Sequence, residues 1–185
     1  MPNQKVNYRG FTLIELLVVI AIIGILSSII MFSLNSARDK AKKARSSMEL
    51  TDARNAIGVM SIDTGLWPNG CPVGDVITVT GNEIELDKPE AGILSVPPQG
   101  PTISGCDWTA EAVGGWGGPY VNSSMIDPWG NAYWFDNDYY SRQDCPTPDA
   151  NPSAPAIAAV VSMGPNGTGG PDASDYDCDD VYVQI

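Results

Sequence analysis

The stretch that decides the fold of this chain is Arg9-Gly10-Phe11-Thr12-Leu13-Ile14-Glu15, which opens an almost unbroken apolar run ending at Phe32. From Phe11 to Phe32 there are 22 residues, and Glu15 is the only charged one. A helix rises about 1.5 Å per residue, so this run would be about 33 Å long and could cross a hydrocarbon core of about 30 Å. The sequence therefore predicts a transmembrane helix over residues 11–32.

A cleaved secretory signal and a retained anchor both have apolar runs near the amino terminus. A secretory signal carries small residues of the A-x-A type directly after its apolar region. Here the chain continues as Ser33-Leu34-Asn35-Ser36-Ala37-Arg38, which is typical of a continuing helix. The retained anchor is the favoured interpretation.

Glu15 needs a partner, because a carboxylate at mid-bilayer costs on the order of 3 kcal/mol or more. A buried charge is tolerated when it is paired, and one polar residue can set the register of packed helices. A paired Glu15 would therefore fix the stagger between neighbouring helices. The alternative is a single-pass anchor whose Glu15 merely lies at the membrane interface.

The Arg9–Glu15 motif ahead of an apolar helix resembles the class III leader of type IV pilins and type II secretion pseudopilins, and the resemblance extends over residues 9–31. It implies that residues 1–10 are a leader that a prepilin peptidase cuts after Gly10, methylating the new amino terminus at Phe11. It also implies that Glu15 neutralises the Phe11 ammonium of a neighbouring subunit. The implied fold is α+β: a long N-terminal helix packed against a small antiparallel β-sheet head.

The helix is expected to continue beyond the membrane as an amphipathic segment over residues 33–65, with its second half under a head formed by residues 66–185. An apolar stripe follows helical spacing, with charged residues opposite it. The stripe comprises Ala37, Ala41, Ala44, Met48, Val59 and Ile62. Gly65 and Trp67-Pro68-Asn69-Gly70 are expected to end the helix.

Charge is strongly segregated along the chain. Up to Arg54 the net charge is +4, and from Asn55 onward it is −16, which together give −12. Such an acidic head argues against nucleic-acid binding and favours a self-repelling or cation-binding surface. Lys5 and Arg9 favour a cytoplasmic amino end with the head outside.

The head is rich in turn residues and has short β-prone runs at 76–80, 83–86, 132–135, 158–162 and 181–183. The first two are expected to form a hairpin turned by Gly81-Asn82. Four cysteines lie in the head, at Cys71, Cys106, Cys145 and Cys178. An even number in an exported domain predicts two disulfides with three possible connectivities, of which we favour the sequential one.

A second resemblance lies near the carboxyl end. Gly118-Pro119-Tyr120, followed by Asp127-Pro128-Trp129-Gly130-Asn131-Ala132-Tyr133, is similar to a segment of the major (G-type) pseudopilins of type II secretion. The residues themselves predict a turn opened by Asp127-Pro128, with Gly130 at positive φ and with Trp129 and Tyr133 anchoring the turn on the core.

Ser162-Met163-Gly164-Pro165-Asn166-Gly167, with the later Asp179-Asp180, resembles the calcium loop of the same proteins. The resemblance implies Ca²⁺ ligands at Asn166, Asp179 and Asp180, with the Met163 carbonyl as an addition, and Asp177 is a further acid that could supply charge. Neutral Asn166 replaces an acid of the family pattern, and the intervening segment is longer. The alternative is a solvated acidic loop held by a Cys178 disulfide.

The favoured function is a non-enzymatic subunit of a helical filament, most simply a type II secretion major pseudopilin. Its implied partners are further copies of itself, the prepilin peptidase, an inner-membrane assembly platform, minor pseudopilins and the membrane. It would begin as a single-pass inner-membrane protein and end in a periplasmic or surface filament. The alternatives are a type IV pilus major or minor pilin with an adhesive or ligand-binding head, and a tethered enzyme, for which no catalytic motif is present.

Overall fold

The computed structural model describes residues 10–75, 81–102, 105–139, 156–168 and 178–185. Its helices are α1 (Leu13–Thr64), the 3-10 helix η1 (Pro89–Ala91) and α2 (Ala110–Gly115). Its strands are β1 (Ile84–Glu85), β2 (Gly100–Pro101), β3 (Asp107–Trp108), β4 (Tyr133–Tyr139), β5 (Ile157–Ser162) and β6 (Val181–Gln184). A long helix and a small antiparallel sheet confirm the predicted α+β class.

The chain divides into two compact units, Met1–Ala41 and Lys42–Ile185, and α1 runs through the boundary. The described part of the first unit is the apolar start of α1. By length and composition this helix can cross a membrane, with a mean hydropathy of 2.9 in its most apolar stretch and none of that stretch buried within the subunit. Signal sequences pass the same test, so the assignment as an anchor depends also on the motif around Glu15.

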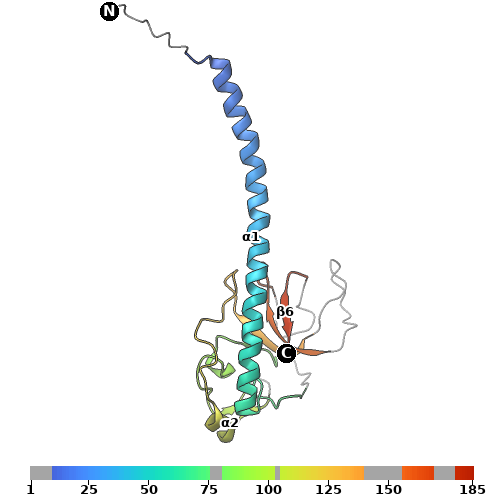
Figure 1. Ribbon diagram of the computed structural model, residues 1–185. Coiled ribbons are helices and arrows are strands. Elements are labelled where there is room, and N and C mark those ends of the chain that lie inside the picture. Colours follow the sequence, from blue (N-terminus) through green and yellow to red (C-terminus); the bar gives the residue numbers. More distant parts are fainter. Residues whose placement is uncertain (1–9, 76–80, 103–104, 140–155, 169–177) are drawn as a thin grey trace, which may run out of the picture. The chain divides into compact units, whose positions relative to one another are not determined.

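The second unit contains a four-stranded sheet in the order β1-β4-β5-β6, in which every described pair is antiparallel. In Figure 1 this sheet lies beside the carboxyl-terminal half of α1. Phe135 of β4 is opposite both Ile84 of β1 and Val160 of β5, so these residues form a buried row across the sheet. A separate two-stranded sheet joins β2 to β3.

The core is the contact between one face of α1 and the sheet. Leu50, Ala53 and Ile57 are almost fully buried and belong to the same cluster as Phe135 and Val160. Their spacing of three and four residues places them on one side of the helix. Full burial of a Leu or Ile side chain contributes about 1.5–3 kcal/mol, so this face is the main link between α1 and the head.

The apolar stripe predicted from the sequence is not the face that packs on the head. Met48, Val59 and Ile62 of that stripe are exposed by 70%, 52% and 83%. The head instead covers the opposite side, where Leu50, Ala53, Ile57 and Met60 lie. The error has a physical cause: large apolar side chains occur on both sides of this half of α1, and the predicted stripe passed over Asp52 and Asn55, which share the exposed side with Val59.

The strand predictions were correct for the three late strands and incomplete for the middle of the chain. The run 132–135 is the start of β4, 158–162 lies within β5, and 181–183 lies within β6. Within the predicted run 83–86, β1 pairs with β4, while its proposed hairpin partner, 76–80, lies outside the described residues. The sequence did not predict η1, the β2–β3 pair or α2.

Candidate functional site

The first candidate site is the start of α1. Phe11 is exposed, and Thr12 precedes the first helical residue. The Thr12 backbone N–H and hydroxyl donate hydrogen bonds to Glu15 Oε2 at 2.8 and 2.7 Å, and the Glu15 N–H donates to Thr12 Oγ1 at 3.3 Å. This reciprocal arrangement is a capping box, which satisfies N–H groups that a helix start leaves open. The T-x-x-E spacing in the sequence carried this signal, which the sequence analysis missed.

The capping box gives Glu15 a role within its own subunit. Its Oε2 atom stabilises the helix start, and its position at the third helical residue leaves the carboxylate beside the exposed Phe11. Gly10 and Phe11 are both exposed, as a peptidase would require of the bond that it cuts. The structure therefore places Gly10 and Phe11 at an accessible position directly before the Thr12–Glu15 capping box.

The second candidate site is built around Asp127. Asp127 is buried, and its Oδ1 accepts hydrogen bonds from the backbone N–H groups of Trp129, Gly130 and Asn131 at 2.8–2.9 Å. Gly130 has a φ of 102°, as the sequence predicted. One side chain therefore holds the whole Asp-Pro-Trp-Gly-Asn turn, because a carboxylate can accept several N–H donors at once.

Asp127 also connects this turn to the predicted calcium loop. Its Oδ2 accepts a hydrogen bond from the Ser162 hydroxyl at 2.7 Å, at the end of β5. Asn131 Nδ2 donates to the Gly164 carbonyl at 3.1 Å. The two carboxyl-terminal motifs, separate in the sequence, are thus one hydrogen-bonded structure.

The two aromatic anchors of the turn differ from each other. Tyr133 is buried, as expected, and its hydroxyl donates to Glu49 Oε2 of α1 at 2.6 Å. Burial, helped by the Glu49 carboxylate, raises the pKa of the Tyr133 phenol well above its usual value. Trp129, expected in the core, is only half-buried and lies beneath Lys42, whose Nζ is 6.0 Å from the ring centre. The Trp129 side chain therefore lies at the surface of the head and not in its core.

The predicted calcium ligands come partly together. Asn166 donates to both carboxylate oxygens of Asp179, from its backbone N–H at 3.2 Å and from Nδ2 at 2.8 Å. Met163 is buried at the end of β5, Asp180 is half-buried, and Asp177 lies outside the described residues. A Cβ on Gly164 would lie 2.4 Å from the Asp179 carbonyl oxygen, so the two sides of the loop meet where only glycine fits.

The chemistry of these donors fits a calcium ion. Asn166, Asp179, Asp180 and the nearby backbone offer oxygens, the atoms that Ca²⁺ prefers. In the described arrangement the amide groups of Asn166 bind the Asp179 carboxylate directly, so a cation at this point would replace those two contacts. The residues thus fit the ion, and in this structure the hydrogen bonds between Asn166 and Asp179 hold the two sides of the loop together.

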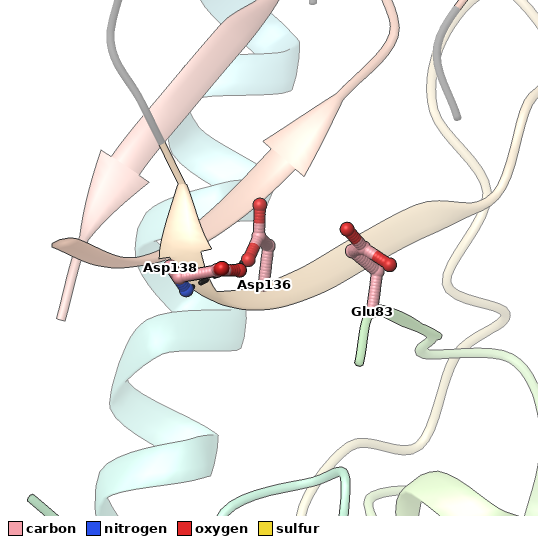
Figure 2. A group of neighbouring side chains, drawn as sticks. All are labelled: Glu83, Asp136 and Asp138. Atoms are coloured by element: carbon pink, nitrogen blue, oxygen red, sulfur yellow. Dashed lines mark hydrogen bonds between the residues drawn. The ribbon is translucent and has the colours of Figure 1, made fainter. Parts of the chain in front are cut away.

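A second acidic group was not predicted. Glu83, Asp136 and Asp138 each place a carboxylate oxygen within 4.8 Å of the others, and such a group could hold a metal ion (Figure 2). Glu83 precedes β1, while Asp136 and Asp138 lie on β4 where its register with β5 shifts, and the Asp138 N–H donates to Asp136 Oδ1 at 2.8 Å. The Asp-x-Asp spacing carried the signal, but the strand predicted from the sequence ended at Phe135.

Buried amides adjoin this acidic group. Asn82 Nδ2 lies 2.7 Å from both Asn137 Oδ1 and Asp138 Oδ1, and Asn69 Nδ2 donates to the Asn82 carbonyl at 3.1 Å. The result is a polar network that connects the chain after α1 to β4. Such networks stabilise a fold when their members are satisfied.

Of the predicted disulfides, Cys71–Cys106 is present and closes a sequence separation of 35 residues. Cys178 is also disulfide-bonded. Its predicted partner, Cys145, lies outside the described residues. The Cys71–Cys106 bond joins the segment after α1 to the β2–β3 pair. Because β2 and β3 have only two residues each, this pair has little regular structure of its own to hold it in place.

Comparison with known proteins gives the family. Residues 5–31 match the model of the prokaryotic N-terminal methylation motif. The chain is 26% identical over 159 residues to the type II secretion system core protein G of Escherichia coli, covering 86% of this chain and 83% of that protein. It is 30% identical over 96 residues to the protein of the same name from Klebsiella pneumoniae, covering 50% of this chain and 68% of that protein.

A type IV major pilin, PilE1 of Neisseria gonorrhoeae, is 32% identical over 66 residues, which is 36% of this chain and 31% of that pilin. No solved structure matches the chain. The coverage of the core G proteins extends well beyond the shared amino-terminal motif, whereas the pilin match is short. This chain belongs to the type II secretion system core protein G family, the G-type pseudopilins.

Proposed function

We propose that this chain is the major pseudopilin of a type II secretion system, the repeated subunit of a helical filament. The observation that carries this proposal is that the apolar half of α1 is unburied within the subunit and begins with a single acid. A helix that is apolar all round must be covered by lipid or by other helices. In the membrane lipid covers it, and in a filament the helices of neighbouring copies do.

Processing would precede assembly. A prepilin peptidase would cut after Gly10 and methylate Phe11, which leaves a charged amine at the start of the apolar helix. Glu15 of one copy would pair with the amine of the next, since each charge alone is costly in an apolar environment. The exposed positions of Gly10 and Phe11 support cleavage at the bond between them.

The carboxyl-terminal half of α1 supplies further contact surface. Its Met48, Val59 and Ile62 face away from the head and offer exposed apolar area beside Asp52 and Asn55. Burying them against another copy would stabilise the filament at about 25 cal/mol per Å² of apolar area. The function of this subunit would be mechanical, and we expect no catalytic activity.

We also propose that Asn166, Asp179 and Asp180, together with the Met163 carbonyl, bind a Ca²⁺ ion, and that Asp177, which lies outside the described residues, supplies a further carboxylate. The support is the meeting of Asn166 with Asp179 and the bracing of the turn by Asp127. An ion that binds only the folded state stabilises it by about 2.7 kcal/mol at one hundred times its Kd. We therefore expect Ca²⁺ to raise the Tm of the purified chain by several degrees relative to EDTA, and equal Tm values in the two buffers would refute the site.

In the cell, the chain would first be a single-pass protein of the inner membrane with its head in the periplasm. An assembly platform in that membrane and minor pseudopilins would be its partners during filament growth. The alternative of a type IV pilus subunit is less favoured, because the pilin match covers only about a third of each chain.

Two measurements test the proposal. Mass spectrometry of the protein from its own cells should find a chain beginning at methylated Phe11. A chain beginning at Met1, or cut after the apolar run, would contradict it. Deleting the gene should abolish export of secreted enzymes while leaving surface pili and surface motility unchanged, whereas the reverse outcome would identify a pilus subunit.

A further inference from the structure

A groove of about 560 Å³ lies on the head between β1, η1, the β2–β3 pair and β4. Its apolar lining includes two tryptophans and two prolines, namely Trp108, Trp134, Pro98 and Pro101. The Trp108 ring is almost fully buried and fixed by a hydrogen bond from Nε1 to the Glu90 carbonyl at 2.8 Å. The groove is thus a rigid, partly aromatic depression on the head.

The rim of this groove is acidic. Glu83, Glu85 and Glu90 line it, and Lys88 is the one basic residue among its lining groups. Lys88 is bound to Glu85 at 2.8 Å, Glu83 is almost fully buried, and Glu90 is exposed. The half-buried Trp134 and the exposed Glu90 suit a long cationic side chain, whose stem packs on the ring while its charged end meets the acid.

This chain carries such side chains on α1. Between Ser36 and Arg45 there are five basic residues and one acid, and all of these basic side chains are exposed. Lys40 and Lys43 are three residues apart and therefore lie on one side of the helix. Among the residues that the structure describes, neither makes an ion pair, whereas Arg45 is bound to Glu49.

We propose that the acidic groove binds the Lys40–Lys43 segment of a second copy of this chain. The inference rests on the proposed filament and names the contact between the head of one subunit and the helix of another. From Asn55 onward the chain has only two basic residues against eighteen acids. Neighbouring heads therefore repel one another, and the basic part of α1 is the one cationic surface that every copy brings to the filament.

A photo-crosslink tests this contact directly in cells that assemble the wild-type chain. The exposed Pro98 in the groove is replaced by p-benzoylphenylalanine, sheared filaments are irradiated, and the crosslinked peptides are sequenced. We expect dimers joined to a peptide within residues 36–47. Dimers joined elsewhere, crosslinks to a different protein or to lipid, or no crosslink at all in intact filaments would each overturn the inference. The filament proposal would survive those outcomes, and it fails separately if the wild-type chain forms no filaments.

Charge exchange provides the second test. Lys43→Glu and Glu90→Lys should each reduce the crosslinked dimer about tenfold, because each places like charges together. The double variant should recover most of the signal. Arg38→Glu and Glu111→Lys are matched controls: Arg38 lies on another side of α1, and Glu111 is an exposed acid on α2 outside the groove lining. Equal losses in the controls, or no recovery in the double variant, would contradict the pairing.

Discussion

The two faces of α1 between Lys42 and Thr64 both carry large apolar side chains but differ in their surroundings and in their polar content. One face places Leu50, Ile57 and Met60 in the core, with no exposed area. The other presents Met48, Val59 and Ile62 to the outside, each more than half exposed, together with the exposed Asp52 and Asn55. A helix that needed only to hold its head would be polar across the whole second face, whereas this face mixes large apolar side chains with polar ones. The comparison indicates that one face serves folding and the other serves contact between copies.

The largest expected difference comes from the same substitution on each face. Ile57→Ala should lower the free energy of unfolding by about 4 kcal/mol, because it leaves a cavity between α1 and the sheet. Ile62→Ala is the matched control and should change it by less than about 0.5 kcal/mol. Urea unfolding of the full chain in detergent measures both. Similar losses for the two variants would mean that the exposed face is also covered within the subunit.

The second prediction concerns the Asp127 turn, which precedes β4, a strand of the sheet that covers the buried face of α1. Asp127→Ala removes the acceptor of three backbone N–H groups and of the Ser162 hydroxyl, and should cost about 3 kcal/mol. Asp127→Asn keeps one oxygen for the N–H groups and should cost clearly less. If Asp127→Ala and Asp127→Asn unfold at the same urea concentration, the side-chain oxygen that asparagine retains does not stabilise the turn.

The third prediction concerns the border between the two faces, where Glu49 accepts the Tyr133 hydrogen bond. Tyr133→Phe should cost about 1.5 kcal/mol, as expected for a bond to a charged acceptor. It should also change the pH dependence. The folded state raises the pKa of Tyr133, so the wild type keeps this contribution below about pH 10 and loses it as the unfolded phenol ionises above that value. The phenylalanine side chain of the variant has no such ionisation, so equal loss of stability from about pH 9 to 11 in both proteins would refute the role of Tyr133.

The smallest effect on stability is expected from the exposed face itself. Replacing Met48, Val59 and Ile62 together by serine should change the free energy of unfolding by less than about 1 kcal/mol, since little of these side chains is buried in the subunit. The yield of sheared filaments should nevertheless fall severalfold. An unchanged yield would mean that this face has no partner in the polymer.

The beginning and end of the chain were predictable because their motifs act locally. The uncharged run after Phe11, the late strands and the turn at Asp127-Pro128 each follow from neighbouring residues. The Thr12–Glu15 capping box, which the sequence analysis did not predict, is equally local, because its T-x-x-E spacing alone brings the two side chains together.

The middle of the chain was not predictable in the same way. The Glu83–Asp136–Asp138 group, the groove at Trp108 and Trp134, and the face of α1 that the head covers all depend on contacts between distant segments. Two-residue strands such as β1 and β2 carry almost no periodic signal. The pairing of Cys71 with Cys106 was the favoured one of three connectivities, but cysteine spacing alone did not decide among them, and the fold brings these two residues together.

The most direct test of the filament account is the yield of sheared filaments from cells that produce Glu15→Ala in place of the wild-type chain. The leader, the apolar run and the head are unchanged in this variant, and Thr12→Ala serves as a control that removes the capping hydroxyl but keeps the acid. We predict that Glu15→Ala lowers the yield at least about tenfold, because the Phe11 amine of the next copy is left without its partner in an apolar core. A normal yield of filaments from Glu15→Ala would contradict the account.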